Sequence, residues 1–160
     1  MREITIYTDG ACRGNPGPGG YGVILEYVDT AGQTFRKELS QGYNVTTNNR
    51  MEVLAAITGL SALKEPCKVT LYSDSKYLVD AIEKGWLRKW QSNAWFRDAK
   101  RKEKAKNVDL WMRLSEQLAR HQVEFRWVKG HADNPYNNRC DELAVAAALD
   151  KEHRIEDTVQ

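Results

Sequence analysis

Alternating apolar and polar positions near the start of the chain predict a strand with one buried face. This two-residue period covers residues 3–9 and includes several β-branched side chains, and the strand is predicted to end at Asp9. Two more alternating segments, 21–28 and 34–43, predict two further strands joined by a short turn. Because short links join antiparallel neighbours, these three strands are expected to form an antiparallel meander.

Helical spacing replaces the alternation after residue 46. Thr47 is a suitable N-cap, apolar residues then follow helical spacing to about Lys64, and Pro66 ends the predicted helix. The other predicted elements are a strand over 68–73, a helix opening at 74–75, a helix over 86–97, a lysine-rich loop over 98–106, a helix over 108–118, a strand over 123–127 and a helix over 137–149.

This order of elements predicts an α/β (or α+β) fold, with a mixed sheet that is antiparallel first and then parallel, and helices on its faces. A chain of 160 residues is long enough for one hydrophobic core, whereas two domains would each be marginal. We therefore expect a single domain over residues 1–150, followed by a polar and mobile tail over 151–160.

Composition narrows the class of protein. The chain is 41% hydrophobic and 29% charged, which is typical of a soluble globular protein. It has no apolar stretch near the ~20 residues of a membrane helix and no apolar region of a signal peptide at its start, so no membrane association is expected. Three cysteines without CxxC spacing argue against structural zinc and a disulfide framework, and favour a cytoplasmic location.

The charge is unevenly distributed along the chain. The net charge is only +2, yet residues 84–106 contain nine lysine or arginine residues and two acids, a net of +7 that leaves −5 for the rest. This separation indicates one region that meets an anion and another that holds cations.

A glycine-rich loop offers a cofactor motif that we reject. Residues 17–22 fit the pattern G-x-G-x-x-G after a predicted strand, but a dinucleotide site also needs a helix to begin there. Val23, Ile24 and Leu25 favour a strand instead, so the segment is interpreted as a turn and no nucleotide cofactor is expected.

Four carboxylates form the main candidate site. Asp9 and Asp74 each end a predicted strand, Glu52 lies in the first turns of a predicted helix, and Asp141 lies near the start of the last helix beside its apolar stripe. If the two strands are parallel neighbours, these acids meet at one edge of the sheet, where open α/β sheets place their sites. The alternative is that Asp9 and Asp74 only cap loops and helices.

Such a cluster predicts a metal ion. Carboxylates held close together repel one another, and a divalent cation removes this penalty. Mg²⁺ prefers oxygen ligands and keeps waters that a substrate phosphate can replace, so we expect Mg²⁺ here, as two ions, with Mn²⁺ able to substitute.

His131 follows the last predicted strand, in the segment WVKGH. It can act as a general base or proton shuttle for a nearby site, although a solvated loop histidine has the same pattern. His121 and His153 lack such a context and are interpreted as structural.

The tryptophans of the basic segment have two readings. Trp86, Trp90 and Trp95 are spaced as on a helix, where aromatic residues usually belong to the core. Surrounded by lysine and arginine, they can instead lie against sugars or bases while the cations meet phosphates. We expect a mixture of both.

Taken together, the motifs resemble the bacterial type 1 ribonuclease H family, ribonuclease HI. The similarity spans nearly the whole chain, in order and at suitable spacings. The matching stretches are YTDGACRGNPGPGGYG (7–22), TTNNRME (46–52), LYSDSKY (71–77), NVDLW (107–111) and WVKGHADNPYNNRCDELA (127–144).

The resemblance implies a fold and a set of roles. The sheet should have five strands, Asp9, Glu52, Asp74 and Asp141 should be the metal-binding acids, and His131 should assist proton movement or product release. Substrate contacts are implied for Asn15, Asn48 and Asn49 in the minor groove of a hybrid, for Thr47 at a DNA phosphate, and for a basic protrusion over 84–106 that includes Trp86, Lys89 and Trp90.

Some positions depart from the family pattern. Lys76, which we include among the substrate-binding residues, stands where relatives often have glutamine, and Val45 stands where an arginine often supports the phosphate pocket. Ala94, Phe96 and residues 132–134 also differ. These departures concern substrate affinity and cleavage preference rather than the chemistry.

The predicted function is a metal-dependent endonuclease that hydrolyses the RNA strand of an RNA–DNA hybrid and leaves 5′-phosphate and 3′-hydroxyl ends. A DNA nuclease or strand transferase on the same fold is one alternative, and a non-catalytic hybrid-binding module is another. Nothing in the sequence demands more than a monomer.

Overall fold

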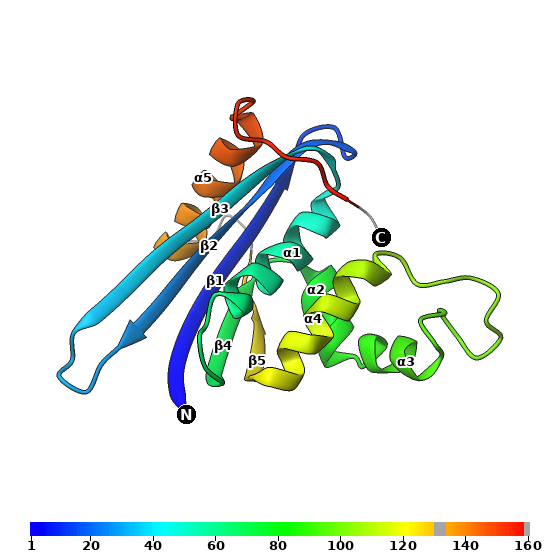
Figure 1. Cartoon of the computed structure of the whole chain (residues 1–160), viewed down its shortest axis with the longest axis horizontal. Helices are drawn as coiled ribbons and strands as arrows, with labels where there is room; N and C mark the ends of the chain where they lie inside the picture. Colours follow the sequence, from blue (N-terminus) through cyan, green and yellow to red (C-terminus); the bar gives the residue numbers. More distant parts are fainter. Residues whose placement is uncertain (130–133, 159–160) are drawn as a thin grey trace.

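The computed structural model of the protein describes residues 1–129 and 134–158 (Figure 1). Ten elements follow one another in these ranges. They are β1 (Arg2–Cys12), β2 (Gly17–Val28), β3 (Thr34–Thr46), α1 (Asn48–Ser61), β4 (Cys67–Ser73), α2 (Lys76–Glu83), α3 (Trp86–Ser92), α4 (Val108–Arg120), β5 (Gln122–Trp127) and α5 (Pro135–Leu149).

One five-stranded sheet organises the molecule, in the order β3-β2-β1-β4-β5. β1, β2 and β3 pair antiparallel, whereas β4 pairs parallel to β1 and β5 parallel to β4. The predicted fold class, a mixed sheet that is antiparallel first and then parallel, is therefore confirmed. β1 lies at the centre, so its residues can reach elements from both halves of the chain.

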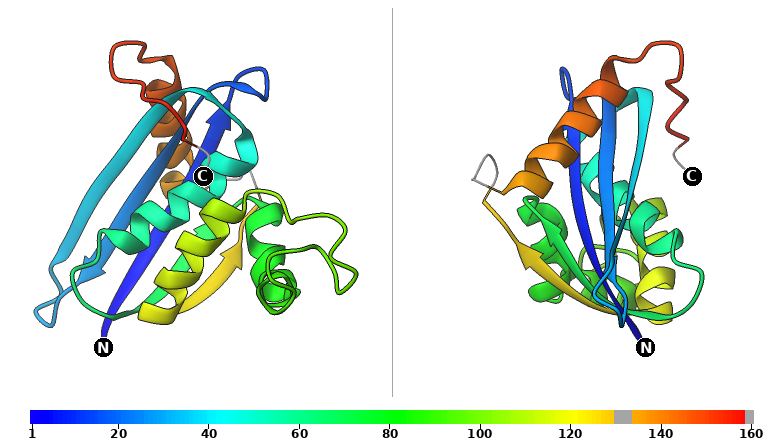
Figure 2. Two further views of the ribbon diagram at one scale, coloured as in Figure 1. Left: turned by 45° about the vertical axis from the view of Figure 1, so that its right-hand side comes forward. Right: turned by 90° about the vertical axis from the view of Figure 1, so that its left-hand side faces the viewer.

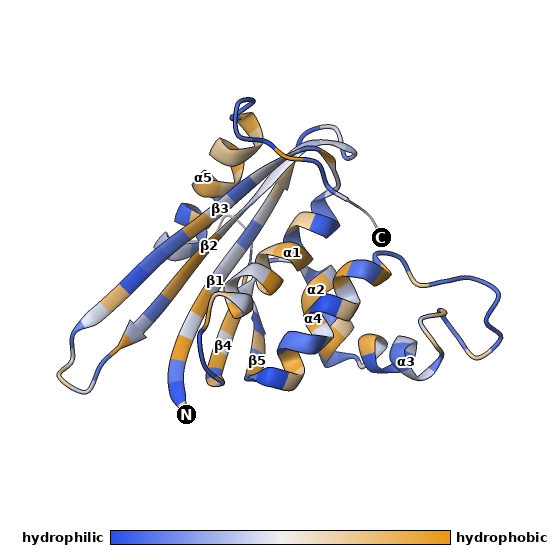
Figure 3. Ribbon diagram, viewed as in Figure 1, coloured by the Kyte–Doolittle hydropathy of each residue, from blue (hydrophilic) through white to orange (hydrophobic). Residues whose placement is uncertain are grey.

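Helices cover the two faces of the sheet unequally (Figure 2). α5 packs on one face, against β1, β2 and β3, while α1 packs on the other face, against β1 and β2, and is itself covered by α4. The core between these layers is apolar. The apolar side chains that alternate along the strands and those on the apolar stripe of α4 contribute to it (Figure 3). Its fully buried side chains include Ile6, Val23, Met51, Leu71, Trp111 and Leu114.

Several predicted boundaries are wrong. β1 continues past Asp9 to Cys12, because β2 remains paired with it as far as Gly19, so residues 17–20 belong to a strand and not to a turn. The helix predicted over 86–97 ends at Ser92. Two residues after it, Ala94 and Trp95, have positive φ angles of 55° and 69°, which a right-handed helix does not allow.

The helices at the two ends of the core also differ slightly from expectation. α1 ends at Ser61 rather than near Lys64. α5 begins at Pro135 rather than at residue 137, because Asn134 caps it and accepts hydrogen bonds from the backbone of Tyr136 and Asn137. Proline is favoured at such a first helical position, since its missing N–H would have no partner there.

The segment after α5 is attached more firmly than its polar sequence suggests. Ile155 forms a β-bridge with Tyr43 in β3, and its backbone exchanges hydrogen bonds with Gly42 and Asn44. Asp157 then reaches Arg50 on α1 with an N–O distance of 2.7 Å. Residues 151–158, part of the segment expected to be a mobile tail, thus fold back along β3.

Within the described ranges, none of the helices combines the length and the apolar character that crossing a bilayer requires.

Candidate active site

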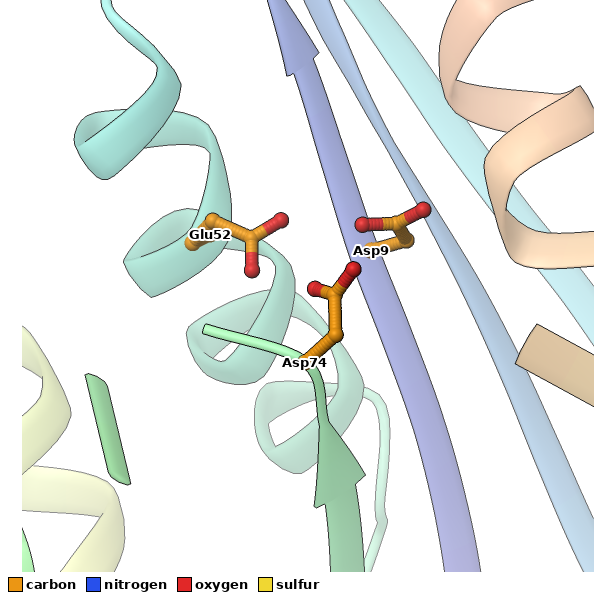
Figure 4. A group of neighbouring side chains, drawn as sticks. All are labelled: Asp9, Glu52 and Asp74. Atoms are coloured by element: carbon orange, nitrogen blue, oxygen red, sulfur yellow. The ribbon is translucent and has the colours of Figure 1, made fainter. Parts of the chain in front are cut away.

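Asp9 and Asp74 come together where β1 and β4 separate (Figure 4). The last β1–β4 pair is Tyr7 with Tyr72, after which β1 continues with β2 alone and β4 ends at Ser73. Asp9 is two residues beyond this point on β1, and Asp74 is two residues beyond it on β4. Parallel pairing therefore places both carboxylates at the same edge, although Asp9 lies inside its strand and not at its end.

Glu52 reaches the same point from α1. Thr47 caps this helix, and its side chain accepts a hydrogen bond from the backbone N–H of Arg50. Glu52 lies on the buried side of the helix, only 3% exposed, and its Oε1 accepts a hydrogen bond from the backbone N–H of Gly10. A Cβ at Gly10 would lie 2.8 Å from the Glu52 backbone nitrogen, so glycine is needed for α1 to approach β1 this closely.

The three carboxylates of Asp9, Glu52 and Asp74 form a compact cluster. One oxygen from each lies within 4.8 Å of the others, a spacing that can hold a metal ion. Burial and the charge of Asp74 raise the pKa of Asp9 to about 8. Burial and the charges of Asp9 and Asp74 likewise raise the pKa of Glu52. Without a cation, the cluster holds its negative charge at a cost in free energy.

Asp141 is outside the three-carboxylate cluster but lines the same cavity, which it reaches from the opposite face of the sheet. α5 lies very close to β2, since a Cβ at Gly22 would be 2.2 Å from the carbonyl oxygen of Cys140. This approach brings the first turns of α5 to the edge where β1 and β4 separate. The cavity there measures about 270 Å³, and it is lined by Asp9, Gly10, Asn48, Glu52, Asp74, Ser75, Asn137, Asn138 and Asp141.

The chemistry of this cavity fits a hard divalent cation. The Oε2 of Glu52 and the Oδ1 of Asn137 are both buried without a hydrogen-bond donor among the described residues. Buried oxygen acceptors ordinarily have partners, and a cation with oxygen ligands would supply them. The acids and the orphaned oxygens together make the cavity a candidate metal centre.

Sequence patterns did not single out Asn137 or Gly10. Asn137 lies one helical turn before Asp141, so a search for polar residues at a spacing of four could have found it. Gly10 carried no such signal, because its importance lies in a contact with a helix far along the chain.

The predicted minor-groove residues meet beside this cavity. Asn15 Oδ1 accepts a hydrogen bond of 2.7 Å from the backbone N–H of Asn48, which ties the loop after β1 to the start of α1. Asn48 also lines the cavity, and Asn49 is exposed next to it. The structure thus groups Asn15, Thr47, Asn48 and Asn49 on one rim, and their contacts with a substrate remain a prediction.

Two tryptophans of the basic protrusion differ in burial, and their contact with a duplex stays a prediction. Trp90 is half-buried with its ring 5.7 Å from that of Trp111, whereas Trp86 is 39% exposed with the Lys84 ammonium 5.5 Å from its ring. Lys89 is exposed on the same helix, and the segment after α3 projects away from the sheet (Figure 1).

Two other predicted residues stand apart from this grouping. Lys76 is exposed at the start of α2, two residues beyond Asp74, with its ammonium over the ring of Trp127. His131 lies outside the residues that the structure describes. By contrast, His121 is buried and bonded to the backbone of Cys67 and Leu60, which fits its structural interpretation.

Comparison with known proteins identifies the class. The sequence model of the RNase H family matches residues 1–149. The chain therefore belongs to the ribonuclease H family.

Individual relatives narrow this to ribonuclease HI. A protein of Desulforamulus reducens named Ribonuclease H is 60% identical over 148 residues, which cover 92% of this chain and 89% of the relative. A protein of Synechocystis named Ribonuclease HI is 57% identical over 145 residues, with 91% and 88% covered. The resemblance to ribonuclease HI is thus confirmed.

Solved structures agree with the fold. LC9-RNase H1, a type 1 RNase H, superposes with a TM-score of 0.82 at 32% identity and covers 92% of this chain and 72% of its own. LC11-RNase H1, solved in complex with an RNA/DNA hybrid, gives a TM-score of 0.61 at 26% identity, with 91% and 96% covered.

Proposed function

We propose that this chain hydrolyses the RNA strand of RNA–DNA hybrids at the carboxylate cavity, leaving 5′-phosphate and 3′-hydroxyl ends. Membership of the ribonuclease H family supports this activity. So does the RNA/DNA hybrid bound to LC11-RNase H1. The single observation in the structure that carries it is the meeting of Asp9, Glu52 and Asp74 at one edge of the sheet.

The four acids are the proposed ligands of the metal. Asp9, Glu52, Asp74 and Asp141 would hold Mg²⁺, proposed as two ions, or Mn²⁺ in its place. When bound, these ions supply activation of a water and stabilisation of the charge that develops at the scissile phosphate. Asp9 is the proposed shared ligand, because it belongs to β1, the central strand of the sheet. Asn137 adds a neutral oxygen beside them.

The rim residues are proposed to read the hybrid. Amide side chains both donate and accept hydrogen bonds, so Asn15, Asn48 and Asn49 can bind the 2′-hydroxyls that distinguish RNA from DNA. Thr47 is proposed to contact a phosphate of the DNA strand. Trp86, Lys89 and Trp90 of the protrusion, together with Lys76, would bind along the duplex, and His131 would assist a proton transfer at the cavity.

The proposed setting is simple. The chain acts as a single domain over residues 1–150, as a monomer and in the cytoplasm, with a hybrid duplex as its only proposed partner. Residues 151–158 follow this domain and contact β3 and α1.

Digestion of three labelled duplexes tests the proposal. A hybrid, a DNA duplex and an RNA duplex of one sequence are incubated with Mg²⁺ and with a chelator, and the product ends are identified. We expect cleavage of the RNA strand of the hybrid only, dependent on the metal, with 5′-phosphate ends. Cleavage of duplex DNA at a similar rate would favour the DNA nuclease, and binding without cleavage would favour a non-catalytic module.

A further inference from the structure

Trp127 is an exposed aromatic side chain that contacts Asp74, one of the residues lining the carboxylate cavity. It ends β5, where it pairs with Ser73, the residue before Asp74. Its side chain is 45% exposed, so the core does not account for it. Single exposed apolar side chains are common on protein surfaces, so the inference rests on the two contacts that this ring makes.

The indole of Trp127 holds the backbone that carries Asp74. Its Nε1 donates a hydrogen bond of 3.1 Å to the carbonyl oxygen of Asp74. The backbone N–H of Val128 donates to the carbonyl oxygen of Ser73 at 2.9 Å. β5 therefore fixes two consecutive peptide groups at the point where β4 ends, and with them the direction of the Asp74 side chain.

The ring face of Trp127 also places a positive charge. The Lys76 ammonium lies 4.9 Å from the ring centroid, within the range of a cation–π contact. An ammonium has three N–H donors, and a contact with a ring face leaves donors available for a ligand. Lys76 follows Ser75, which lines the cavity, and its ammonium lies over a residue of β5.

We propose that Trp127 is a positioning residue of the active site. Its N–H fixes Asp74, and its ring holds the Lys76 ammonium where a backbone phosphate next to the scissile one is bound. This inference rests on the proposed function, because only a bound nucleic-acid strand supplies that second phosphate. Trp127 itself need not touch the reacting atoms.

Three substitutions separate the two roles. Trp127→Phe keeps an aromatic ring but removes the N–H donor, Lys76→Gln removes the charge, and Trp127→Leu removes both the donor and the ring face. Each variant is assayed for kcat and KM on an RNA–DNA hybrid with Mg²⁺. Its equilibrium binding to the same hybrid is measured in a chelator over a range of salt concentrations.

The two roles predict different outcomes. Trp127→Phe should lower kcat about 3- to 10-fold with little change in KM. Lys76→Gln should raise KM and reduce the slope of log affinity against log salt by about one, the value for one lost phosphate contact. Trp127→Leu should show both effects, and its effect on KM should disappear in a Lys76→Gln background, since the two residues act through one contact.

Matched controls come from the same sheet. Phe35→Leu removes another exposed aromatic ring, on β3, and Lys68→Gln removes one positive charge at the opposite end of β4. Both should leave kcat, KM and the salt slope unchanged. A salt slope that stays at the wild-type value in Trp127→Leu, or additive KM effects of Trp127→Leu and Lys76→Gln, would overturn the inference.

Folding and function remain distinguishable in this design. If Trp127→Leu does not fold, Trp127→Phe still decides, because an unchanged kcat in that variant contradicts the hydrogen-bond role. If the wild-type protein does not cut hybrids at all, the proposed function fails. If it cuts them and the variants behave as wild type, only the role of Trp127 fails.

Discussion

Two charged residues on α1, Arg50 and Glu52, are equally buried in opposite surroundings. Arg50 is 5% exposed and Glu52 is 3% exposed. Arg50 binds Asp109 and Asp157, each with an N–O distance of 2.7 Å, whereas Glu52 faces Asp9 and Asp74. One helix therefore carries a compensated charge cluster and, two residues later, an uncompensated one.

In the Arg50 cluster the charges of opposite sign pair with one another. Arg50 hydrogen-bonds both acids, and Asp157 also accepts a bond of 2.7 Å from Thr46. Burial acts to raise the pKa of Asp157, but the hydrogen bonds from Arg50 and Thr46 outweigh it, so this pKa is lowered. The cluster fastens the segment after α5 to α1 and α4.

In the carboxylate cavity, equally buried acids have pKa values shifted in the opposite direction. The pKa values of Asp9 and Glu52 are raised, because the described residues of the cluster supply acids and no balancing cation. The difference between the two clusters teaches that burial of charge alone does not indicate function. A cluster whose charge is unbalanced within the chain indicates a ligand from outside it.

The largest expected effect comes from removing one acid of the cavity. Asp9→Asn keeps the shape of the side chain but removes a metal ligand, so we expect cleavage to fall by roughly 10³-fold or more. Hybrid binding in a chelator should be retained. Glu3→Gln, at the exposed start of the same strand, is the matched control and should cleave normally. Normal turnover of Asp9→Asn would refute the proposed metal site.

The next effect comes from breaking the compensated cluster. Asp157→Ala leaves Arg50 buried with Asp109 as its one acidic partner in the cluster and removes the partner of Thr46, so we expect a loss of about 3 kcal/mol in the free energy of unfolding. Denaturant unfolding in a chelator measures it. Asp150→Ala, on the same segment but exposed, should change stability by less than about 0.5 kcal/mol. Equal effects of both substitutions would contradict a stabilising role of the Arg50 cluster.

The low pKa of Asp157 also gives this cluster a pH dependence. A carboxyl group whose pKa is lower in the folded state stabilises the fold above its unfolded pKa, and this stability is lost as the pH falls through the folded pKa. At low pH, the free energy of unfolding of Asp157→Asn should therefore depend less steeply on pH than that of the wild-type protein.

The cavity should show the opposite pH dependence in the absence of metal. A raised pKa stabilises the fold below the unfolded value, and this contribution is lost as the pH rises toward about 8, the pKa of Asp9. The metal-free protein should lose about 2 kcal/mol of stability between pH 6 and pH 8, since one pKa unit corresponds to about 1.4 kcal/mol. Added Mg²⁺, or Asp9→Asn, should reduce this loss. If the free energy of unfolding in a chelator did not change between pH 6 and pH 8, the proposed unbalanced charge of the cavity would be contradicted.

The smallest expected effect concerns Val45, which precedes the rim residue Thr47 by two positions. Val45 is 61% exposed beside Thr46, at a position where an arginine would add a charge near the proposed phosphate contact of Thr47. Val45→Arg should strengthen hybrid binding about two- to fivefold at low salt, less at high salt, and leave stability unchanged. Val45→Gln controls for size and polarity. Equal binding by both variants would remove the electrostatic explanation.

Patterns in the sequence were sufficient for the architecture, and three of the four acids they singled out, Asp9, Glu52 and Asp74, meet in the structure. Alternation predicted the strands, helical spacing predicted most helices, and the mixed sheet followed from their order. The boundaries were less accurate where pairing partners decide them. β1 continues past Asp9 only because β2 remains paired beside it, and α3 ends at Ser92, before the positive φ angles of Ala94 and Trp95.

By itself, the sequence determined the order of elements, the family resemblance and the residue types suited to a metal, because these depend on periodicity and on local chemistry. Only the tertiary structure decided which charges are balanced. Arg50 and Glu52 are two residues apart on one helix, yet their partners come from β1, from beyond β4, from α4 and from the segment after α5. Spacing along the chain cannot specify such long-range partners, which are set by how the sheet and its helices pack.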